Sequence, residues 1–393
     1  MSATAAPVVD RPGDPIAAVT HPDPYPYYAD LVATRPIHRD DRLGLWVACG
    51  AAAVTDVLGH PACLVRPQSE PVPRPLLGSP AGAIFGRLVR MSDGVRHAAL
   101  KPAVLAVTAR VESSVGEPAG RWAAHLVGEL KPAGDPARVN ELAFRLSAYV
   151  LAELSGVAPD ELARTAALAR DFAQSIAPAA TSEQRAQGAD AAGELLEVFR
   201  ALLAARGATR RATLLDDLDR EAAGGAARED VVANGIGFLS QAYEATAGLI
   251  GNTLVTLGRL RAEASRADRG DLDAFVREVV RYDPPVQNTR RFVMRDATVA
   301  GQSMKAGDAV LVVLAAANRD PLANPDPSRF DPLRSPRQAF TFGSGPHACP
   351  GEAIATTIAA AGVRALLAGG VDPERLASGV TYRPSANTRV PAF

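Results

Sequence analysis

The sequence predicts a mainly helical α+β protein, an array of helices joined to small β-sheets. Apolar residues recur at three- and four-residue intervals through most of residues 94–262, which is typical of packed helices. Short alternating apolar segments, bounded by turn residues, lie on either side of this region. The polar segments between helices are short and no sequence repeat is present, so one domain over residues 1–393 is predicted.

The N-terminal part is predicted to form a small sheet with flanking helices. A short helix over Pro26–Ala33 precedes a strand over Gly44–Cys49 and a helix over Ala51–Leu58. Prolines and glycines in Gln68–Gly86 oppose a continuous helix or a central strand. This segment is therefore expected to be a long loop that serves as a binding element or lid, or else as a linker.

The central region is predicted to be a helical array. Its helices are expected over six segments: Gly94–Ala109, Val115–Leu130, Arg138–Leu154, Pro159–Ile176, Ser182–Arg206 and Leu214–Ala223. The longest helix, Glu229–Ala262, is apolar on nearly every side and should be buried all round. Glu244 lies in its middle, where a carboxylate either serves a site or forms an ion pair with a buried arginine.

A second β region follows this helix. Apolar segments at Arg291–Met294 and Val310–Leu314 predict short strands, and Lys305–Asp308 predicts a turn. The last 26 residues are expected to add little more than a hairpin.

Composition excludes several classes of function. With 42 Lys+Arg against 43 Asp+Glu, the net charge of −1 argues against nucleic-acid binding through bulk electrostatics. No apolar stretch is long enough for a membrane span and Met1–Asp10 lacks the features of a signal peptide, so a cytoplasmic protein with no membrane partner is expected. The abundance of arginine and alanine suggests a GC-rich bacterial genome.

Cys349 is the strongest indication of chemistry. It lies in the glycine-rich segment FTFGSGPHACPG, ahead of a helix expected from Glu352. Backbone N–H groups and the positive end of a helix favour a thiolate there. No cysteine or histidine lies at zinc-ligand spacing, so Cys349 fits the single axial ligand of a porphyrin iron. Gly345 and Gly351 would allow close approach and unusual dihedral angles, and His347 could bind a haem propionate.

This segment resembles the haem-binding loop of the cytochrome P450 family. Phe342, Gly345, His347, Cys349 and Gly351 match its F-x-x-G-x-[HR]-x-C-x-G spacing. The resemblance extends over nearly the whole chain and is to the soluble bacterial members. It implies one P450-like domain around a buried haem b, with Cys349 as the ligand of the iron and the other four residues as cofactor contacts.

Further matches imply roles for residues elsewhere. Glu278 and Arg281 in REVVRY, together with Arg334 in FDPLR, resemble the structural Glu/Arg network of the family. His97 and Lys101 resemble the propionate-binding pair, in which the second residue is more often arginine. Arg291 resembles the family's strand arginine, which also binds a propionate.

The long helix departs from the family pattern A-G-x-[DE]-T, whose acid and alcohol deliver protons to oxygen. The aligned segment is Gln241-Ala242-Tyr243-Glu244-Ala245-Thr246, so the acid is kept and the usual threonine is Ala245. Thr246 lies about 100° further round the helix, where its hydroxyl is expected to face away from the iron. Glu244, Gln241 and Thr246 are the candidate catalytic residues. A bound water, a polar group of the substrate, coupling chemistry, peroxide use or a helix distortion around Thr246 could replace the lost hydroxyl.

The lining of the expected pocket is more polar than a pocket for an unsubstituted hydrocarbon would be. Its candidate lining comprises the Gln68–Gly86 loop with Arg74, then Gln241, Ala242, Ala245, Val286–Thr289 with Asn288, and Asn387–Val390 with Thr388 and Arg389. This lining favours a functionalised natural-product intermediate, including a peptide or polyketide. The implied activity is a haem-thiolate monooxygenase that uses O2.

Electrons are expected from a ferredoxin and its reductase. The candidate docking patch for these proteins is basic and comprises Arg96, Lys101, Arg110 and Arg337, which could instead be simply solvated charges. Two alternatives to hydroxylation remain: oxidative cross-linking of aromatic rings in a peptide, and a haem-free relative that only recruits partners.

Overall fold

Helices make up most of the protein, as predicted. The computed structural model describes residues 11–205, 212–260 and 272–393. Seven helices follow one another in the central region: α4 (Gly94–Glu112), α5 (Gly116–Leu130), α6 (Pro136–Leu154), α7 (Leu162–Ser175), α8 (Ser182–Ala204), α9 (Leu214–Glu221) and α10 (Arg228–Arg259). They confirm the predicted array. The expected helix ends at Arg206 and Ala262, and the segment Met1–Asp10, lie outside the described residues.

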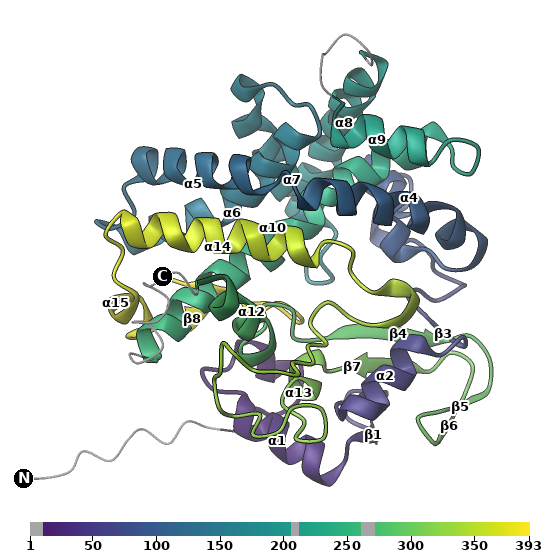
Figure 1. Cartoon of the computed structure of the whole chain (residues 1–393). Helices are drawn as coiled ribbons and strands as arrows, with labels where there is room; N and C mark the ends of the chain where they lie inside the picture. The colour runs from purple at the N-terminus through teal and green to yellow at the C-terminus, as the bar shows by residue number, and fades with distance from the viewer. Residues whose placement is uncertain (1–10, 206–211, 261–271) are drawn as a thin grey trace, which may run out of the picture.

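Helix α10 runs through the centre of the helical part, where α6 and α14 (Glu352–Ala368) lie alongside it (Figure 1). It also contacts α7, α12 (Leu272–Tyr282) and α15 (Pro373–Ala377). Most of its residues are buried, because apolar side chains on every side find a neighbouring helix. A helix enclosed in this way has its polar groups fixed relative to several other elements.

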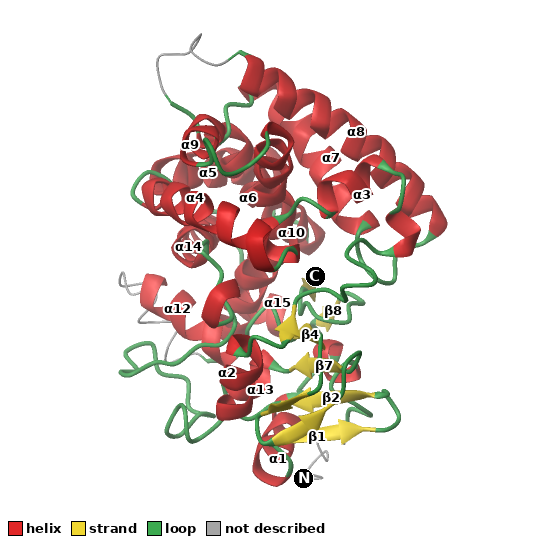
Figure 2. Ribbon diagram, turned by 90° about the vertical axis from the view of Figure 1, so that its right-hand side faces the viewer, coloured by secondary structure: helices red, strands yellow, loops and turns green. Residues whose placement is uncertain are grey.

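The strands of the main sheet lie toward the opposite end from most of the helices (Figure 2). The main sheet has the order β1-β2-β7-β4-β3, with bounds Ile37–Asp40, Leu45–Ala48, Ala309–Val312, Thr289–Val293 and Cys63–Leu64. Strands β2 and β7 pair in parallel with Trp46 opposite Val310, and the other neighbours pair antiparallel. The two β regions predicted separately therefore form one sheet.

Short helices flank this sheet and a second hairpin extends from it. The helices are α1 (Tyr25–Thr34), α2 (Ala51–Gly59) and α13 (Leu314–Ala317), preceded by the 3-10 turn η1 (Ala17–Thr20). The hairpin consists of β5 (Ala297–Val299) and β6 (Gln302–Met304), which pair antiparallel. The N-terminal helices and strand confirm the elements predicted there.

Two segments contain more structure than the sequence predicts. The expected loop over 68–86 holds a 3-10 turn, η2 (Arg74–Leu76), and helix α3 (Pro80–Phe85). Proline begins α3, where its missing N–H is not needed, and Ser79 Oγ caps the helix by accepting from Gly82 N at 3.1 Å. The C-terminal segment carries α15 ahead of the expected hairpin, β8 (Thr381–Tyr382) with β9 (Pro391–Ala392).

A buried ionic network joins α12 to the segment that precedes Cys349. Glu278 Oε1 accepts from Arg281 Nη2 at 2.6 Å and from Arg334 Nε at 3.3 Å, so the three predicted residues are in contact. Arg337 Nε donates to Glu278 Oε2 at 2.9 Å, and its side chain is only 17% exposed. Arg337 is thus a fourth member of the network, and its predicted place on a free docking surface is wrong.

The other expected docking residues also have partners within the chain. Arg96 pairs with Asp230, and Arg110 pairs with Glu221. Lys101 Nζ donates to Ala348 O at 2.6 Å. Arg96 and Arg110 are therefore exposed cations that are each paired with a carboxylate, whereas Arg337 belongs to the buried network. Among the described residues, no helix combines the length and the apolar character that crossing a bilayer requires.

Candidate active site

Cys349 lies in a tight loop between a 3-10 turn, η6 (Gly345–His347), and the start of α14. Cys349 N donates to Phe342 O at 2.8 Å, which closes the loop, and Gly351 N donates to the sulfur at 3.4 Å. The thiol is accessible, unlike the buried Cys49 and Cys63. Cys349 is therefore the described cysteine placed to bind a ligand.

Of the two glycines that were expected to adopt unusual dihedral angles, Gly345 and Gly351, only Gly345 does so. Gly345 has φ +69°, and a Cβ there would lie 3.1 Å from Leu58 O in α2. Gly351 has φ −98°, which any residue adopts, so the unusual dihedral angle expected there is wrong. A Cβ at Gly351 would instead lie 3.8 Å from the Cys349 sulfur.

The metal-free thiol is less acidic than the sequence predicts. Burial raises the pKa of Cys349. The Gly351 N–H and the cations Lys101 and Arg90 act in the opposite direction without overcoming burial. The expected thiolate therefore requires a cation at the sulfur, and a bound metal ion supplies one.

Basic side chains gather beside this loop from α4, β4 and the loop itself. The rings of His97 and His347 lie 4.2 Å apart between centroids. His347 Nε2 lies 3.0 Å from Asp93 Oδ1, so this carboxylate already engages a nitrogen expected to bind a propionate. Buried nitrogens of two predicted propionate-binding residues, His97 Nε2 and Arg291 Nε, have no hydrogen-bond partner among the described residues.

These unpartnered nitrogens provide a test of whether a haem fits. A buried donor without a partner costs free energy, about 1–3 kcal/mol, unless a ligand satisfies it. Burial lowers the pKa of His97 and of Arg291, so a carboxylate ligand would relieve both groups. The accessible thiol and these nitrogens fit a haem whose iron binds Cys349 and whose propionates meet His97 and Arg291.

One face of α10 forms a partly exposed stripe within an otherwise buried stretch. Phe238, Gln241, Ala242 and Ala245 recur at three- and four-residue spacing, so they lie on the same side of the helix. Glu244 is partly exposed as well. Three of the four stripe residues are predicted pocket residues. Phe238 was missed, because a phenylalanine in an apolar helix gives no signal of a cavity.

Tyr243 and Thr246, which also belong to the Gln241–Thr246 segment, lie away from this stripe. Tyr243 packs on Phe144 with ring centroids 4.8 Å apart. Thr246 is fully buried, and its Oγ1 has no hydrogen-bond partner within the described ranges. The Thr246 hydroxyl is thus on a different face of α10 from Ala245.

The predicted C-terminal pocket residues do come together. Val286 and Thr388 form a β-bridge, and Asn288 Nδ2 donates to Ala386 O at 2.8 Å. Thr388 Oγ1 donates to Glu244 Oε2 at 3.1 Å. The partner of Glu244 is therefore a hydroxyl, and no arginine pairs with it among the described residues.

Arg389 and Arg74, the two arginines expected in the pocket, lie in very different surroundings. Arg389 is fully buried, where it pairs with Asp283 at 2.9 Å and donates to the carbonyl oxygens of Val19, His21 and Pro22. It ties the N-terminal segment to the C-terminal loop, so its predicted pocket role is wrong. Arg74 is highly exposed on η2 beside Glu70.

Arg90 is the cation that sequence reasoning missed. It lies in a 3-10 turn, η3 (Val89–Met91), which Asn234 of α10 clamps by accepting from Val89 N and donating to Arg87 O, both at 2.9 Å. The Arg90 side chain has accessible surface, yet burial lowers its pKa to about 10. Cys349 is near enough to influence this pKa.

Arg90 has no ion-pair partner among the described residues, whereas its neighbours Arg87 and Arg96 both pair with Asp230. The only signal in the sequence is a charge inside the apolar run RLVRM.

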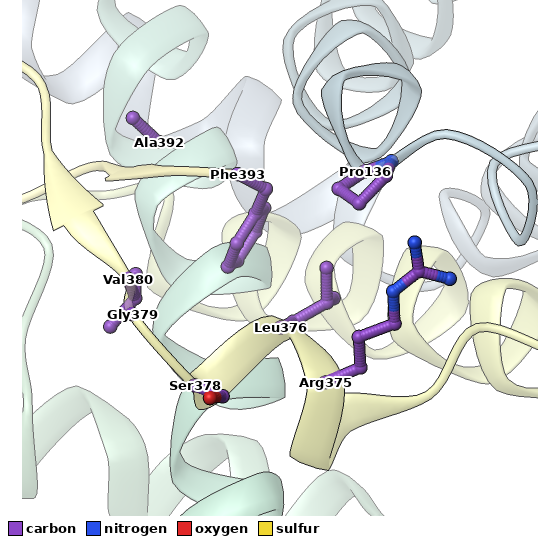
Figure 3. A pocket seen from close by; sticks show the side chains of 8 residues that line it. All are labelled: Pro136, Arg375, Leu376, Ser378, Gly379, Val380, Ala392 and Phe393. Atoms are coloured by element: carbon purple, nitrogen blue, oxygen red, sulfur yellow. The ribbon is translucent and has the colours of Figure 1, made fainter.

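A separate pocket lies near the C-terminus (Figure 3). It has a volume of about 450 Å³. Its lining comes from α15, the start of α6 and the C-terminal hairpin: Pro136, Arg375, Leu376, Ser378, Gly379, Val380, Ala392 and Phe393. None of the predicted site residues is among those that line it.

Comparisons with known proteins agree with this geometry. Residues 253–368 match the family model described as Cytochrome P450. The chain is 30% identical over 363 residues to the cytochrome P450 monooxygenase PikC of Streptomyces venezuelae, covering 88% of this chain and 83% of PikC. It is 29% identical over 334 residues to the cyclomarin C epoxidase CymV of Salinispora arenicola (strain CNS-205), covering 83% of each.

A solved structure extends the likeness to the fold. The crystal structure of CalO2 superposes with a TM-score of 0.80 at 27% identity, over 94% of each chain. The loop that presents Cys349, the Glu278 network and these relatives together lead to one conclusion: the chain belongs to the cytochrome P450 family, whose members are haem-dependent oxidoreductases.

Proposed function

We propose that this P450 monooxygenase oxidises a functionalised natural-product intermediate, with Cys349 as the ligand of the haem iron. The observation that carries the proposal is the accessible Cys349 thiol beside buried, unpartnered nitrogens of His97 and Arg291. His347, Lys101, Phe342, Gly345 and Gly351 complete the proposed cofactor contacts. Bound haem supplies the oxygen chemistry, in which two electrons activate O2 and one oxygen atom enters the substrate.

The α10 stripe is the proposed substrate wall. Phe238, Ala242 and Ala245 offer apolar contact, and small residues at the last two positions leave room beside them. Gln241 Nε2 donates to Gly237 O at 2.7 Å, so its amide folds back along the helix and leaves its carbonyl oxygen for other donors. Val286, Asn288 and Thr388 are the proposed contacts opposite.

Glu244 is the proposed proton donor. A positioned acid is worth roughly a hundred- to ten-thousand-fold in rate, and Ala245 lacks the hydroxyl that would normally assist it. Gln241 and Glu244 present a carbonyl and a carboxylate oxygen that can order a water between them. Thr246 lies off this path in the helix as it stands.

Arg90 supports a substrate that carries an acidic group. An unpaired guanidinium inside a protein is stabilised by a carboxylate, because the desolvated cation recovers charge and hydrogen bonds. CymV is named for the epoxidation of cyclomarin C, which is consistent with a biosynthetic role for this enzyme.

Binding of paired ligands tests the role of Arg90. Natural-product acids and their methyl esters are titrated into the haem-loaded protein, and binding is followed by the Soret shift. The wild type should prefer acids over esters by at least about tenfold, and Arg90→Gln should abolish this preference. Arg74→Gln, which changes an exposed arginine, should retain it. Equal preference in wild type and Arg90→Gln would refute an acid-binding role.

Electrons are proposed to come from a ferredoxin and its reductase in the cytoplasm. Each residue of the expected basic patch has a partner in the chain, so specific docking through these four cations has no support from the geometry. Purified ferredoxin pairs compared for the rate of haem reduction would identify the partner.

Product mass decides between oxygenation and coupling. A gain of one oxygen supports the proposal, whereas a loss of two hydrogens supports oxidative cross-linking of aromatic rings. The haem-free recruitment alternative is not favoured, because the thiol and the propionate-binding nitrogens are all retained.

A further inference from the structure

Glu244 is connected to the surface by two hydroxyl groups from the other end of the chain. Thr388 Oγ1 lies 3.1 Å from Glu244 Oε2, and Ser385 Oγ lies 2.8 Å from Thr388 Oγ1. Thr388 is buried, whereas Ser385 is partly exposed and lies next to the exposed Pro384. The three side chains therefore form a continuous path from solvent to the carboxylate of α10.

The hydrogen bonds in this path share one direction. An ionised carboxylate only accepts, so the Thr388 hydroxyl donates to Glu244 and has only lone pairs left for Ser385. Ser385 Oγ accepts from the backbone N–H groups of Asn387 at 3.3 Å and Thr388 at 3.0 Å. Its own proton has two acceptors, Thr388 Oγ1 at 2.8 Å and Asn387 Oδ1 at 3.5 Å, and the shorter contact favours donation to Thr388 and so toward Glu244.

The C-terminal loop holds Thr388 firmly in this position. Gln287 N donates to Asn387 O at 2.8 Å, and Arg389 N donates to Pro285 O at 2.7 Å. Gly248 of α10 lets the loop approach closely, since a Cβ there would lie 2.8 Å from Pro285 Cβ and 3.0 Å from Arg389 O. The hydroxyl is therefore fixed before any substrate binds.

We propose that Thr388 and Ser385 resupply Glu244 with protons and so replace the hydroxyl that Ala245 lacks. This inference rests on the proposed function of Glu244. When Glu244 gives its proton to an oxygen in the cavity, the Thr388 hydroxyl passes its proton to the carboxylate and takes that of Ser385. Ser385 is then reprotonated by solvent, so four protons each move one place and no electrons are transferred. Thr388 and Ser385 are positioning residues that act through Glu244.

The first measurement needs no turnover. The infrared bands of the Glu244 carboxyl group, identified by their loss in Glu244→Gln, are measured in the resting protein. Thr388→Val removes the hydrogen bond to this carboxyl group and should shift the frequency of its C–O stretching band. Thr388→Ser should restore the wild-type value. Thr381→Val, an exposed position on β8 in the same segment, is the matched control and should change nothing.

The second measurement follows the protons during turnover. Thr388→Val should divert reducing equivalents from product to hydrogen peroxide and lower product per electron by at least about tenfold, with a larger D2O effect than the wild type. Ser385→Ala should likewise lower the product formed per electron and enlarge the D2O effect. Thr388→Ser should restore the wild-type yield of product per electron.

The outcomes separate this inference from the proposed function. A shifted Glu244 infrared band with unchanged coupling in Thr388→Val would overturn the relay and leave only a structural contact. No change in either measurement would overturn it as well, and so would unchanged coupling in Glu244→Gln. Absence of any oxygenated product from the wild type would instead refute the proposed function, while the infrared result would still report the hydrogen bond.

Discussion

Individual polar atoms without partners mark the cofactor site more clearly than any single motif residue. His97 Nε2 and Arg291 Nε are buried polar nitrogens on different elements, and both lie on residues that the sequence pattern assigns to propionates. Arg90, which is proposed to bind an acidic group of the substrate, also has no carboxylate partner among the described residues. A chain that leaves such groups unsatisfied gains stability from an anionic ligand, because the ligand replaces the lost hydration.

His97 predicts a pH dependence of the haem-free protein. Burial, with the charges of His347 and Lys101, lowers the pKa of His97 in the folded state below its ordinary 6.5. The unfolded chain therefore binds a proton at His97 that the folded chain does not. Stability should fall as the pH drops below about 6.5, and should level off below the folded-state pKa.

Urea unfolding of the haem-free protein at about pH 7.5 and about pH 5.5 checks this expectation. His97→Gln keeps a neutral polar side chain and should lose less free energy of unfolding between the two pH values than the wild type does. An identical loss in both proteins would show that His97 does not carry the effect.

Residue chemistry was predictable where one position determines it. The role of Cys349 and the pairing of Glu278 with Arg281 could be predicted, because each depends on residue spacing within a short segment of sequence. The roles of Arg389 and Arg90 could not be predicted, because each depends on whether a carboxylate lies near the arginine in space. Arg389 meets Asp283 at 2.9 Å, whereas Arg90 meets none among the described residues.

Helix α12 illustrates how one element supports the site at a distance. Glu278 is completely buried and accepts hydrogen bonds from Arg281, Arg334 and Arg337, which hold the segment leading to Cys349. On the same helix, Asp273 forms an exposed ion pair with Arg364 at 3.6 Å. The two carboxylates therefore allow buried and exposed pairing to be compared within one element.

Glu278→Gln should lower the free energy of unfolding by about 3–5 kcal/mol, because it leaves buried guanidinium groups without their counter-charge. Asp273→Asn should change it by less than about 1 kcal/mol. Urea unfolding of both variants measures the difference, and haem content after purification should fall only in Glu278→Gln. Equal destabilisation by the two substitutions would contradict the assigned role of the network.

Across the whole molecule, the helical array followed from apolar periodicity, while the long-range arrangement did not. The parallel pairing of β2 with β7 joins segments that are distant in sequence, and alternation within each strand cannot show it. Thr388 meets Glu244 across 144 positions of chain. The candidate pocket segments were predicted, yet only the fold reveals which of their side chains touch.

The central claim is that Cys349 binds the haem iron, and the ferrous carbon monoxide difference spectrum tests it most directly. Wild-type protein should show the red-shifted Soret band of a thiolate-ligated haem, and Cys349→Ala should lose it. Cys63→Ala, which changes a buried cysteine, should keep the band. A thiolate-type band that persists in Cys349→Ala, or its absence from haem-loaded wild type, would contradict the account.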